Sequence, residues 1–256
     1  MDNAELASLS TSGDLSRITL RRPPLNFLNG ELLRQINTHI ESLGDLPSYS
    51  ALVLDADGTA FCAGLEMSER TKEGIFLLLE QYHRALGSLS SFPLPTIAIV
   101  RGMALGAGNE LAACCDFVFA TEKASFGQPE IKSGAVPSVA SMILPPLIGH
   151  RKTLELILTG KIISALEAEQ IGLIHRAVPE NQLQTAVDGL LKTLRTLSRP
   201  VLELALRMGR SARCREMEEH LREAESVYLN ELMDLEDPIE GAKSFMEKRS
   251  PRWKHR

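Results

Sequence analysis

The sequence lacks the cysteine and histidine patterns of a metal site or a disulfide framework. Its four cysteines are Cys62, Cys114, Cys115 and Cys214, and no two of them form a C-x-x-C pair. No histidine cluster stands near them at the spacing that zinc ligands require. Cys114 and Cys115 are adjacent in an apolar stretch. We therefore predict reduced core thiols, no bound metal and a protein of the cytosol.

Long apolar runs and an excess of positive charge are also missing. No apolar run approaches the ~18 residues that a membrane-spanning helix needs. Residues 1–14 are acidic and polar, without the features of a signal or transit peptide. The chain has 28 basic and 33 acidic residues, a formal net charge of −5. These absences predict a cytoplasmic protein and argue against bulk binding to nucleic acid or to an anionic membrane.

What is present is an ordinary globular composition, with 44% hydrophobic and 24% charged residues among 256. That length suits one large α/β core with a small appendage. Apolar and periodic segments alternate along the first part of the chain. Expected strands cover 15–20, 51–54, 96–100 and 117–120, and expected helices cover 30–43, 74–89 and 106–115. This rhythm is typical of a parallel sheet covered by helices.

After about residue 150 the strand pattern fades. Helical periodicity continues over 155–159, 165–171, 182–197, 200–213, 216–232 and 237–249, and an irregular basic tail follows. No Gly/Ser-rich linker separates the two parts. We predict an α/β core over residues 1–195 and a helical region over residues 196–256.

Two glycine-containing turns follow expected strands of the core. Residues 60–67 come after the strand at 51–54, and Gly106-Ala107-Gly108 comes after the strand at 96–100. Parallel sheets place ligands beyond the carboxyl ends of their strands, and a helix start offers free backbone N–H groups. Two such groups converging on one carbonyl oxygen would form an oxyanion hole. The alternative is that the glycines only make turns. The second turn fails as a dinucleotide fingerprint, because Leu111 stands where a third glycine is required.

Two glutamates stand in settings unlike those of a solvated surface acid. Glu110 precedes an almost wholly apolar helical stretch, 111–115, and should face a pocket, where its place near the helix N-terminus favours the ionised form. Glu130 follows Pro129 in a partly apolar loop. Two carboxyl groups sharing one site push one pKa upward, which supplies an acid and a base at neutral pH. The pair therefore predicts addition of water to an activated double bond.

The chain as a whole resembles the crotonase superfamily of enoyl-CoA hydratases and isomerases. The matching segments lie in order along nearly the whole chain, which makes the resemblance more specific than any single motif. They are residues 61–66, residues 104–111, Cys115-Asp116, residues 126–131, residues 158–160 with 168–173, and residues 245–249.

This resemblance implies a crotonase-like spiral of ββα turns with a C-terminal helical trimerisation region, assembled as a homotrimer or a dimer of trimers. Carried over residue by residue, the catalytic pair is Glu110 and Glu130, and the backbone N–H groups of Leu65 and Ala107 form the oxyanion hole. Hydratases of the family keep both glutamates, whereas isomerases usually lack one. The expected substrate is an acyl-CoA thioester. No cofactor is expected, because the thioester itself is the electron sink.

The resemblance also implies contacts to the substrate and to its coenzyme A part. They are Cys62, Ala63, Gly64, Glu66 and Met67 on the first turn, Gly106 on the second, Pro129, Pro137 and Ser138 around the second glutamate, and Phe245 and Lys248 near the C-terminus. The last two match positions that meet coenzyme A, often from a neighbouring subunit.

Departures from the common hydratase pattern bear on the acyl group. Ala107 replaces a glycine, Leu65-Glu66 replaces an Ala-Asp pair, and residues 134–141 replace a glycine-rich loop that should border the acyl group. The chain is also similar to the branch that acts on cyclic dienoyl-CoA esters, the cyclohexa-1,5-diene-1-carbonyl-CoA hydratases of aromatic compound degradation. That similarity lies in residues 22–26, 127–132, 228–233 and 236–237. The sequence thus favours hydration of an enoyl-CoA or cyclic dienoyl-CoA thioester.

Other interpretations stay open at this stage. One is an isomerase that moves the double bond with a single glutamate. Another is a non-catalytic crotonase-fold protein that binds RNA or a partner, against which the net acidity weighs. The six histidines are scattered without a base–nucleophile context and are expected to be structural or at the surface. The acyl group, 1,2 or 1,4 addition, the stereochemistry and the assignment of acid and base are also open.

Overall fold

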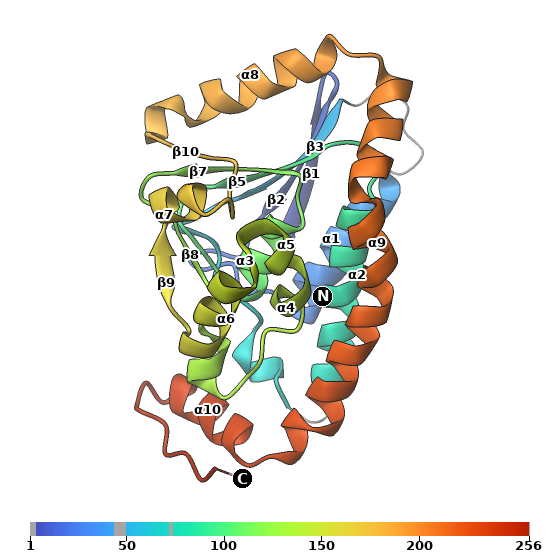
Figure 1. The fold of residues 1–256 in the computed structure, drawn as a ribbon. Helices are drawn as coiled ribbons and strands as arrows, with labels where there is room; N and C mark the ends of the chain where they lie inside the picture. The colour runs from blue at the N-terminus through green and yellow to red at the C-terminus, as the bar shows by residue number, and fades with distance from the viewer. Residues whose placement is uncertain (1–3, 44–49, 72–73, 256) are drawn as a thin grey trace.

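The computed structural model describes residues 4–43, 50–71 and 74–255, and of residues 212–216 and 218 only the backbone. Within these ranges the strands form two sheets (Figure 1). One sheet contains, in order, β1(Ala7–Ser12), β2(Leu15–Leu20), β3(Ala51–Ala56), β5(Thr96–Val100), β7(Phe117–Thr121) and β10(Arg176–Val178). The other contains β4(Ala60–Cys62), β6(Met103–Leu105), β8(Ser125–Gly127) and β9(Ile162–Ser164).

Successive strands from β3 to β8 alternate between the two sheets, and a helix follows each pair. β3 and β4 lead into the 3-10 helix η1(Met67–Glu69) and into α2(Ile75–Ser90), β5 and β6 into α3(Ala107–Ala113), and β7 and β8 into the 3-10 helix η2(Pro129–Ser133) and α4(Ala140–Ile143). Corresponding strands of neighbouring turns pair in parallel. β3 pairs with β5 and β5 with β7 in one sheet, and β4 pairs with β6 and β6 with β8 in the other. This arrangement is the predicted spiral of ββα turns and confirms the α/β fold class.

The other described helices are α1(Gly30–Ser42), α5(Pro145–Ile148), α6(His150–Thr159), α7(Ala165–Gln170), η3(Glu180–Gln182), α8(Leu183–Arg195), α9(Arg199–Asn230), η4(Leu232–Asp234) and α10(Asp237–Met246). Figure 1 shows α9 running down one side of the molecule along α2, while α10 closes its lower end. Helix α8 lies across the six-stranded sheet at the top of the same view. No described helix combines the length and the apolar character that a bilayer crossing demands.

Burial explains why the central strands are continuous apolar runs. Ala51–Val53 of β3 and the whole of β5 are buried, because helices cover both faces of the sheet. A small core under α8 joins Val53 and Ile97 to Val187 and Leu191. The main core lies on the other face and includes residues from α1, α2, α3 and α9. The C-terminal part thus shares its apolar packing with the α/β part.

The sequence pattern missed several elements. Residues 200–213 and 216–232 were expected as two helices, but α9 runs unbroken from Arg199 to Asn230. Strands β9 and β10 lie beyond residue 150, where no strand was predicted, and β4, β6 and β8 were also missed. Each of these five strands has three residues, too few to show a period of two. Strand β1 was missed because its second half is exposed and polar.

Candidate active site

Leu65 and Ala107 occupy equivalent positions on two neighbouring turns of the spiral. Cys62 of β4 pairs with Ala104 of β6 in a parallel ladder. Leu65 lies three residues after Cys62, and Ala107 lies three residues after Ala104. Because neighbouring strands lie about 4.8 Å apart, the two chains leave the sheet side by side. The fold therefore brings the two predicted donors to one region.

The N–H groups of Leu65 and Ala107 are unpaired among the described residues, whereas those of their neighbours in the turns are paired. The N–H groups of Glu66 and Gly106, their neighbours, each donate to a backbone carbonyl oxygen at 2.9 Å. No described residue accepts a hydrogen bond from the N–H of Leu65 or of Ala107. Both residues are buried. Buried N–H groups are nearly always paired in folded proteins, so these two donors can serve an oxygen atom of a ligand.

Two glycines allow the close approach on which the turn at α3 depends. Gly106 has a left-handed φ of 54°, and a Cβ added there would lie 2.3 Å from Glu130 Oε1. A Cβ added at Gly108 would lie 2.2 Å from the carbonyl oxygen of Cys62. The first glycine thus admits the Glu130 carboxyl group to the turn, and the second lets α3 pack against β4.

Glu110 lies in the first turn of α3 with 1% of its surface exposed. Its Oε1 accepts from the N–H groups of Val139 at 3.0 Å and Ala140 at 2.6 Å. Its Oε2 accepts from the hydroxyl group of Tyr82. Burial raises the pKa of Glu110, and the three donors act in the opposite direction. The carboxyl group is therefore fixed from both sides, in a setting that favours its charged form more than burial alone would allow.

Glu130 lies in η2 and is 7% exposed. Burial raises the pKa of Glu130 to about 8, and the nearby charge of Glu110 adds to this effect. With its amide nitrogen turned toward Glu130, Gln128 lies 3.2 Å from both carboxyl oxygens, and its own oxygen accepts from Asn109 at 3.1 Å. Glu130 thus retains a proton near neutral pH. The charge of Glu110 acts on the pKa of Glu130, so the two carboxyl groups lie in one region, and their roles as acid and base stay a prediction.

A cavity of about 290 Å³ lies beside Glu130. Eight of the predicted site residues line this cavity. Seven come from the two glycine turns and from η2, and one comes from α10. They are Ala63, Gly64, Leu65, Met67, Gly106, Pro129, Glu130 and Phe245. The cavity wall also includes the cations Arg70, Lys132 and Arg249, which were not predicted as site residues.

The other predicted site residues, with Ala107 and Glu110 among them, do not line this cavity. Cys62 is fully buried, and burial raises the pKa of its thiol to about 12, so the thiol is inert. Glu66 pairs with Arg22 at 2.7 Å. Ser138 is buried on the loop that precedes the two N–H donors to Glu110, Pro137 is half-buried beside it, and Lys248 is exposed after α10.

His83 overturns one expectation. The histidines were expected to lack a base–nucleophile context, but His83 Nδ1 lies 2.7 Å from Glu225 Oε1, and its Nε2 lies 3.2 Å from Ser138 Oγ. His83 is buried on α2. No local pattern could reveal this chain of contacts, because its members lie on α2, α9 and the loop before α4. Tyr82 was missed for a related reason, since an aromatic residue on the apolar face of a helix predicts core packing.

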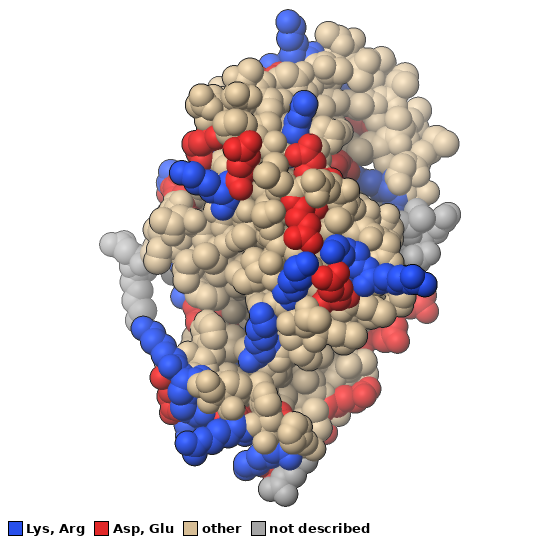
Figure 2. All heavy atoms as spheres, turned by 60° about the vertical axis from the view of Figure 1, so that its left-hand side comes forward, with Lys and Arg blue, Asp and Glu red and all other residues tan. Residues whose placement is uncertain are grey.

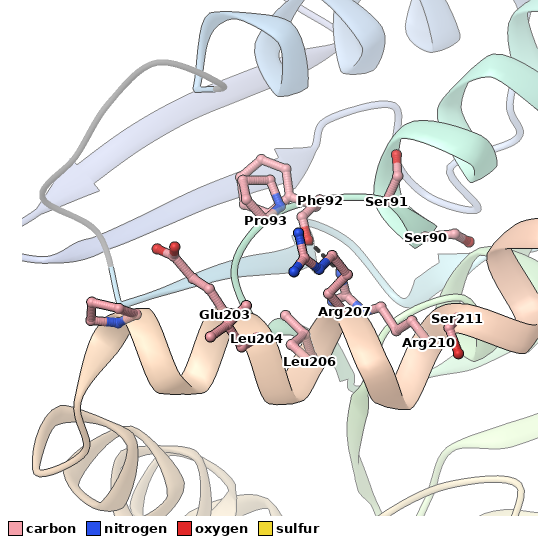
Figure 3. Close-up of a pocket in the computed structure, with 11 residues that line it drawn as sticks. Ser90, Ser91, Phe92, Pro93, Glu203, Leu204, Leu206, Arg207, Arg210 and Ser211 are labelled. Atoms are coloured by element: carbon pink, nitrogen blue, oxygen red, sulfur yellow. Dashed lines mark hydrogen bonds between the residues drawn. The ribbon is translucent and has the colours of Figure 1, made fainter.

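A larger cavity, about 750 Å³, lies between the loop at Phe92–Pro93 and the first half of α9 (Figure 3). Its buried cation, Arg210, is fully engaged there. Arg210 Nε donates to Asp116 at 2.7 Å, and its Nη1 donates to the carbonyl oxygen of Phe92. Because the unpaired N–H groups and the carboxyl pair lie elsewhere, we place the candidate site at the smaller cavity.

Basic side chains gather at the lower end of the face in Figure 2, the end that α10 and the tail occupy in Figure 1. Higher on the same face, basic and acidic side chains are mixed. Lys248, Arg252 and Lys254 belong to this lower end and are exposed. This group of basic side chains follows α10, which supplies Phe245 to the cavity wall, and Lys254 within the group pairs with Glu236 at 2.6 Å.

The spiral of ββα turns, with its paired turns at one cavity, defines a crotonase-type protein. The sequence model of the enoyl-CoA hydratase/isomerase family matches residues 10–256. The chain belongs to this family, and hydratase-type chemistry is the function that membership supports.

Two curated relatives match nearly the whole chain. The probable enoyl-CoA hydratase echA8 of Mycobacterium bovis is 37% identical over 247 residues, which cover 93% of this chain and 94% of the relative. The cyclohexa-1,5-dienecarbonyl-CoA hydratase of Thauera aromatica is 32% identical over 248 residues, which cover 97% of this chain and 96% of the relative. Both support the predicted superfamily.

Solved structures agree with the fold. An enoyl-CoA hydratase/isomerase from Xanthobacter autotrophicus superposes with a TM-score of 0.86 at 28% identity, covering 94% of this chain and 93% of the other. An enoyl-CoA hydratase from Mycobacterium avium gives a TM-score of 0.85 at 24% identity, covering 97% and 98%. The second likeness concerns the fold alone.

Proposed function

We propose that the protein adds water to the conjugated double bond of an enoyl-CoA or cyclic dienoyl-CoA thioester. The observation that carries this proposal is the pair of unpaired N–H groups on Leu65 and Ala107 beside the buried carboxyl groups of Glu110 and Glu130. An unpaired N–H pair suits a thioester oxygen that gains negative charge, and a carboxyl pair suits the movement of two protons.

The reaction follows from these positions. The thioester oxygen accepts from both N–H groups, which draws electrons from the alkene toward the carbonyl group and stabilises the enolate. One such donor contributes roughly 10²–10³ in rate. A water oxygen then bonds to Cβ and gives its proton to one carboxylate, and Cα takes a proton from the other carboxyl group. Glu130, which keeps its proton near neutral pH, suits the second role, and Glu110 suits the first.

No cofactor is needed in this scheme, because the thioester accepts the electrons of the alkene. Coenzyme A is part of the substrate, and the basic end of the molecule near Phe245 and Lys248 is the proposed place for its phosphates. The proposed setting is the cytoplasm.

The test compares Glu110→Gln and Glu130→Gln in a spectrophotometric assay with crotonyl-CoA, the products being resolved by mass. Each variant should lose roughly 10²–10⁴ in kcat, the contribution of a positioned acid or base. Glu122→Gln, which changes an exposed glutamate on a nearby loop, should retain full activity. A product of unchanged mass, together with full tolerance of one substitution, would instead identify an isomerase.

The acyl group calls for a second comparison. The relative from Thauera aromatica motivates cyclohexa-1,5-diene-1-carbonyl-CoA as a candidate substrate. Wild-type protein should be assayed on this thioester and on crotonyl-CoA side by side. Faster turnover of the cyclic thioester would place the protein in aromatic compound degradation, whereas faster turnover of crotonyl-CoA would identify a general enoyl-CoA hydratase.

Association into a homotrimer or a dimer of trimers is also proposed. A row of exposed apolar side chains runs along the first half of α9 at helical spacing, namely Leu197 just before the helix, then Val201, Leu204 and Met208. The double variant Val201→Glu/Met208→Glu should lower the molar mass in light scattering. Leu166→Glu, at an exposed apolar residue of α7, is the matched control. An unchanged mass in the α9 variant would exclude this face as the interface.

A further inference from the structure

Arg70 holds two buried donors that nothing in the described structure satisfies. It follows η1 and lines the cavity beside Glu130. Its Nε and Nη1 are buried and have no hydrogen-bond partner among the described residues. Burying an unpaired cationic donor is costly. Such an arrangement points to an acceptor that arrives with a ligand.

The contrast with other partly or fully buried arginines is clear. Arg22 pairs with Glu66 at 2.7 Å, Arg210 with Asp116, and Arg249 with Glu240 at 3.0 Å through Nη2. Arg70 also lies near two acidic groups. Its charge lowers the pKa of both Glu110 and Glu130. It nevertheless makes no hydrogen bond to either of them.

Both glutamates have hydrogen-bonding neighbours other than Arg70. The oxygens of Glu110 are taken by Tyr82, Val139 and Ala140. Glu130 faces Gln128 and keeps its proton near neutral pH. A guanidinium group whose only task is to neutralise a carboxylate would bond to it, as the other arginines do. The geometry therefore leaves Arg70 for a third partner.

Tyr228 adds a second polar group in the same region. It is buried at the C-terminal end of α9, and burial raises its pKa. Arg70 and Glu130 both act on this pKa, in opposite directions, so Tyr228 stands within reach of both charges. No described residue forms a hydrogen bond with its hydroxyl group. Tyr228 does not line the cavity itself, but its hydroxyl group is a second polar group in this region without a partner among the described residues.

We propose that Arg70 binds a carboxylate on the acyl group, so that the preferred substrates are short enoyl-CoA thioesters that carry a second carboxylate at the far end of the acyl chain. This inference rests on the proposed function and narrows its substrate class. A guanidinium–carboxylate contact is charge-assisted and among the stronger hydrogen bonds in proteins. The cavity of about 290 Å³ is at the small end for ligand pockets, which favours a short acyl group.

The test uses a matched pair of substrates. trans-Glutaconyl-CoA carries a carboxylate on C4, and trans-5-methylhex-2-enoyl-CoA carries an isopropyl group of similar shape in its place. The wild-type ratio of kcat/KM, glutaconyl over methylhexenoyl, should exceed about 10. Arg70→Met should lower this ratio by roughly 10²-fold, the scale expected when one partner of a buried charge pair is removed. Arg70→Lys should recover part of it.

Binding provides a readout that does not depend on turnover. Calorimetry with the saturated thioesters glutaryl-CoA and 5-methylhexanoyl-CoA should show that wild-type protein prefers glutaryl-CoA and that Arg70→Met loses this preference. Arg151→Met, at an exposed arginine of α6, should keep the wild-type preference. Thermal unfolding of each variant confirms that it is folded.

The outcomes separate this inference from the proposed function. Hydration of methylhexenoyl-CoA or crotonyl-CoA without a preference for glutaconyl-CoA overturns the role of Arg70 and leaves the hydratase intact. An unchanged ratio in Arg70→Met also overturns it, because Arg70 would then act on the glutamates alone. A preference for glutaryl-CoA in binding, with no hydration of any thioester, would support Arg70 and refute the hydratase.

Discussion

His83 Nδ1 lies 2.7 Å from Glu225 Oε1, which links α2 to α9 across 142 positions of the sequence. The other ring nitrogen faces Ser138, the residue before the two N–H donors to Glu110. One imidazole therefore joins the C-terminal helix to the loop that fixes a candidate catalytic carboxyl group. Its protonation state bears on stability as well as on the site.

The first prediction concerns this histidine. Burial lowers the pKa of His83, the neighbouring His220 also lowers it, and Glu225 opposes both. The unfolded chain then binds more protons than the folded one as pH falls below about 6.5, so the free energy of unfolding decreases there. Chemical denaturation at a series of pH values should show that the free energy of unfolding falls less at acid pH in His83→Gln than in wild type. His150→Gln, at an exposed position, should behave as wild type; equal losses in all three proteins would contradict the prediction.

The second prediction concerns Tyr82→Phe, which removes the donor to Glu110 Oε2 and keeps the ring. Because that hydrogen bond lowers the pKa of Glu110, the variant should raise this pKa. Leaving a buried acceptor with one donor fewer costs about 1–3 kcal/mol. We expect a loss of that size in denaturant unfolding and a lower rate of crotonyl-CoA hydration. Full stability and full activity in the variant would show that the contact has no role.

The third prediction concerns the proton on Glu130. Its pKa is raised to about 8, mainly by burial, so the folded protein binds more protons than the unfolded chain between about pH 4.5 and 8. Stability then falls as pH rises through that window. At pH 9, Glu130→Gln should therefore have a larger free energy of unfolding than wild type. The difference should be at least about 1.4 kcal/mol, the equivalent of one pKa unit. The difference should shrink toward pH 5, and wild-type hydration should decline above pH 8. A pH-independent difference would refute the raised pKa.

The fourth prediction tests the packing of α3 on β4. Gly108→Ala would place a Cβ 2.2 Å from the carbonyl oxygen of Cys62, so the helix must shift. Overpacking of this kind costs about 1–3 kcal/mol or more, and the shift should also reduce hydration. Gly87→Ala in α2 is the matched control, since an added Cβ meets nothing within 4 Å and removes a glycine from a helix. The free energy of unfolding of this control variant should increase by up to about 1 kcal/mol. Equal effects would show that close approach at Gly108 is not limiting.

The predicted site residues lie at turns of the chain. The residues that were not predicted act through contacts with segments far away in the sequence. Glycines, a proline and strand ends mark the turns that carry Leu65, Ala107 and Glu130, and the resemblance to the crotonase superfamily singled out these residues within them. Arg70 and Tyr82 were not predicted, because an arginine after a short helix and a tyrosine on an apolar helical face look like ordinary surface and core residues. Their importance comes from neighbours that only the packed fold supplies.

Whether a strand could be predicted from the hydrophobic pattern depended on its length. The six-residue strand β2 and the apolar run of β3 were found, whereas β4, β6 and β8 were not, although they carry the turns of the site. The break expected between 213 and 216 was wrong for a different reason. Helix α9 continues there, and Met217 and Leu221 pack into the main core. Tertiary packing outweighed the local pattern.

The ladder that aligns Cys62 with Ala104 continues to a third strand, where Ala104 pairs with Phe126. Counting three residues onward gives Leu65, Ala107 and then Pro129. Proline has no N–H to offer. The series of donors therefore stops at two, and the residue that follows the proline contributes a carboxyl group instead. Repetition of one structural unit thus places unpaired N–H groups at two matching positions, and the proline at the third position ends that series one residue before Glu130.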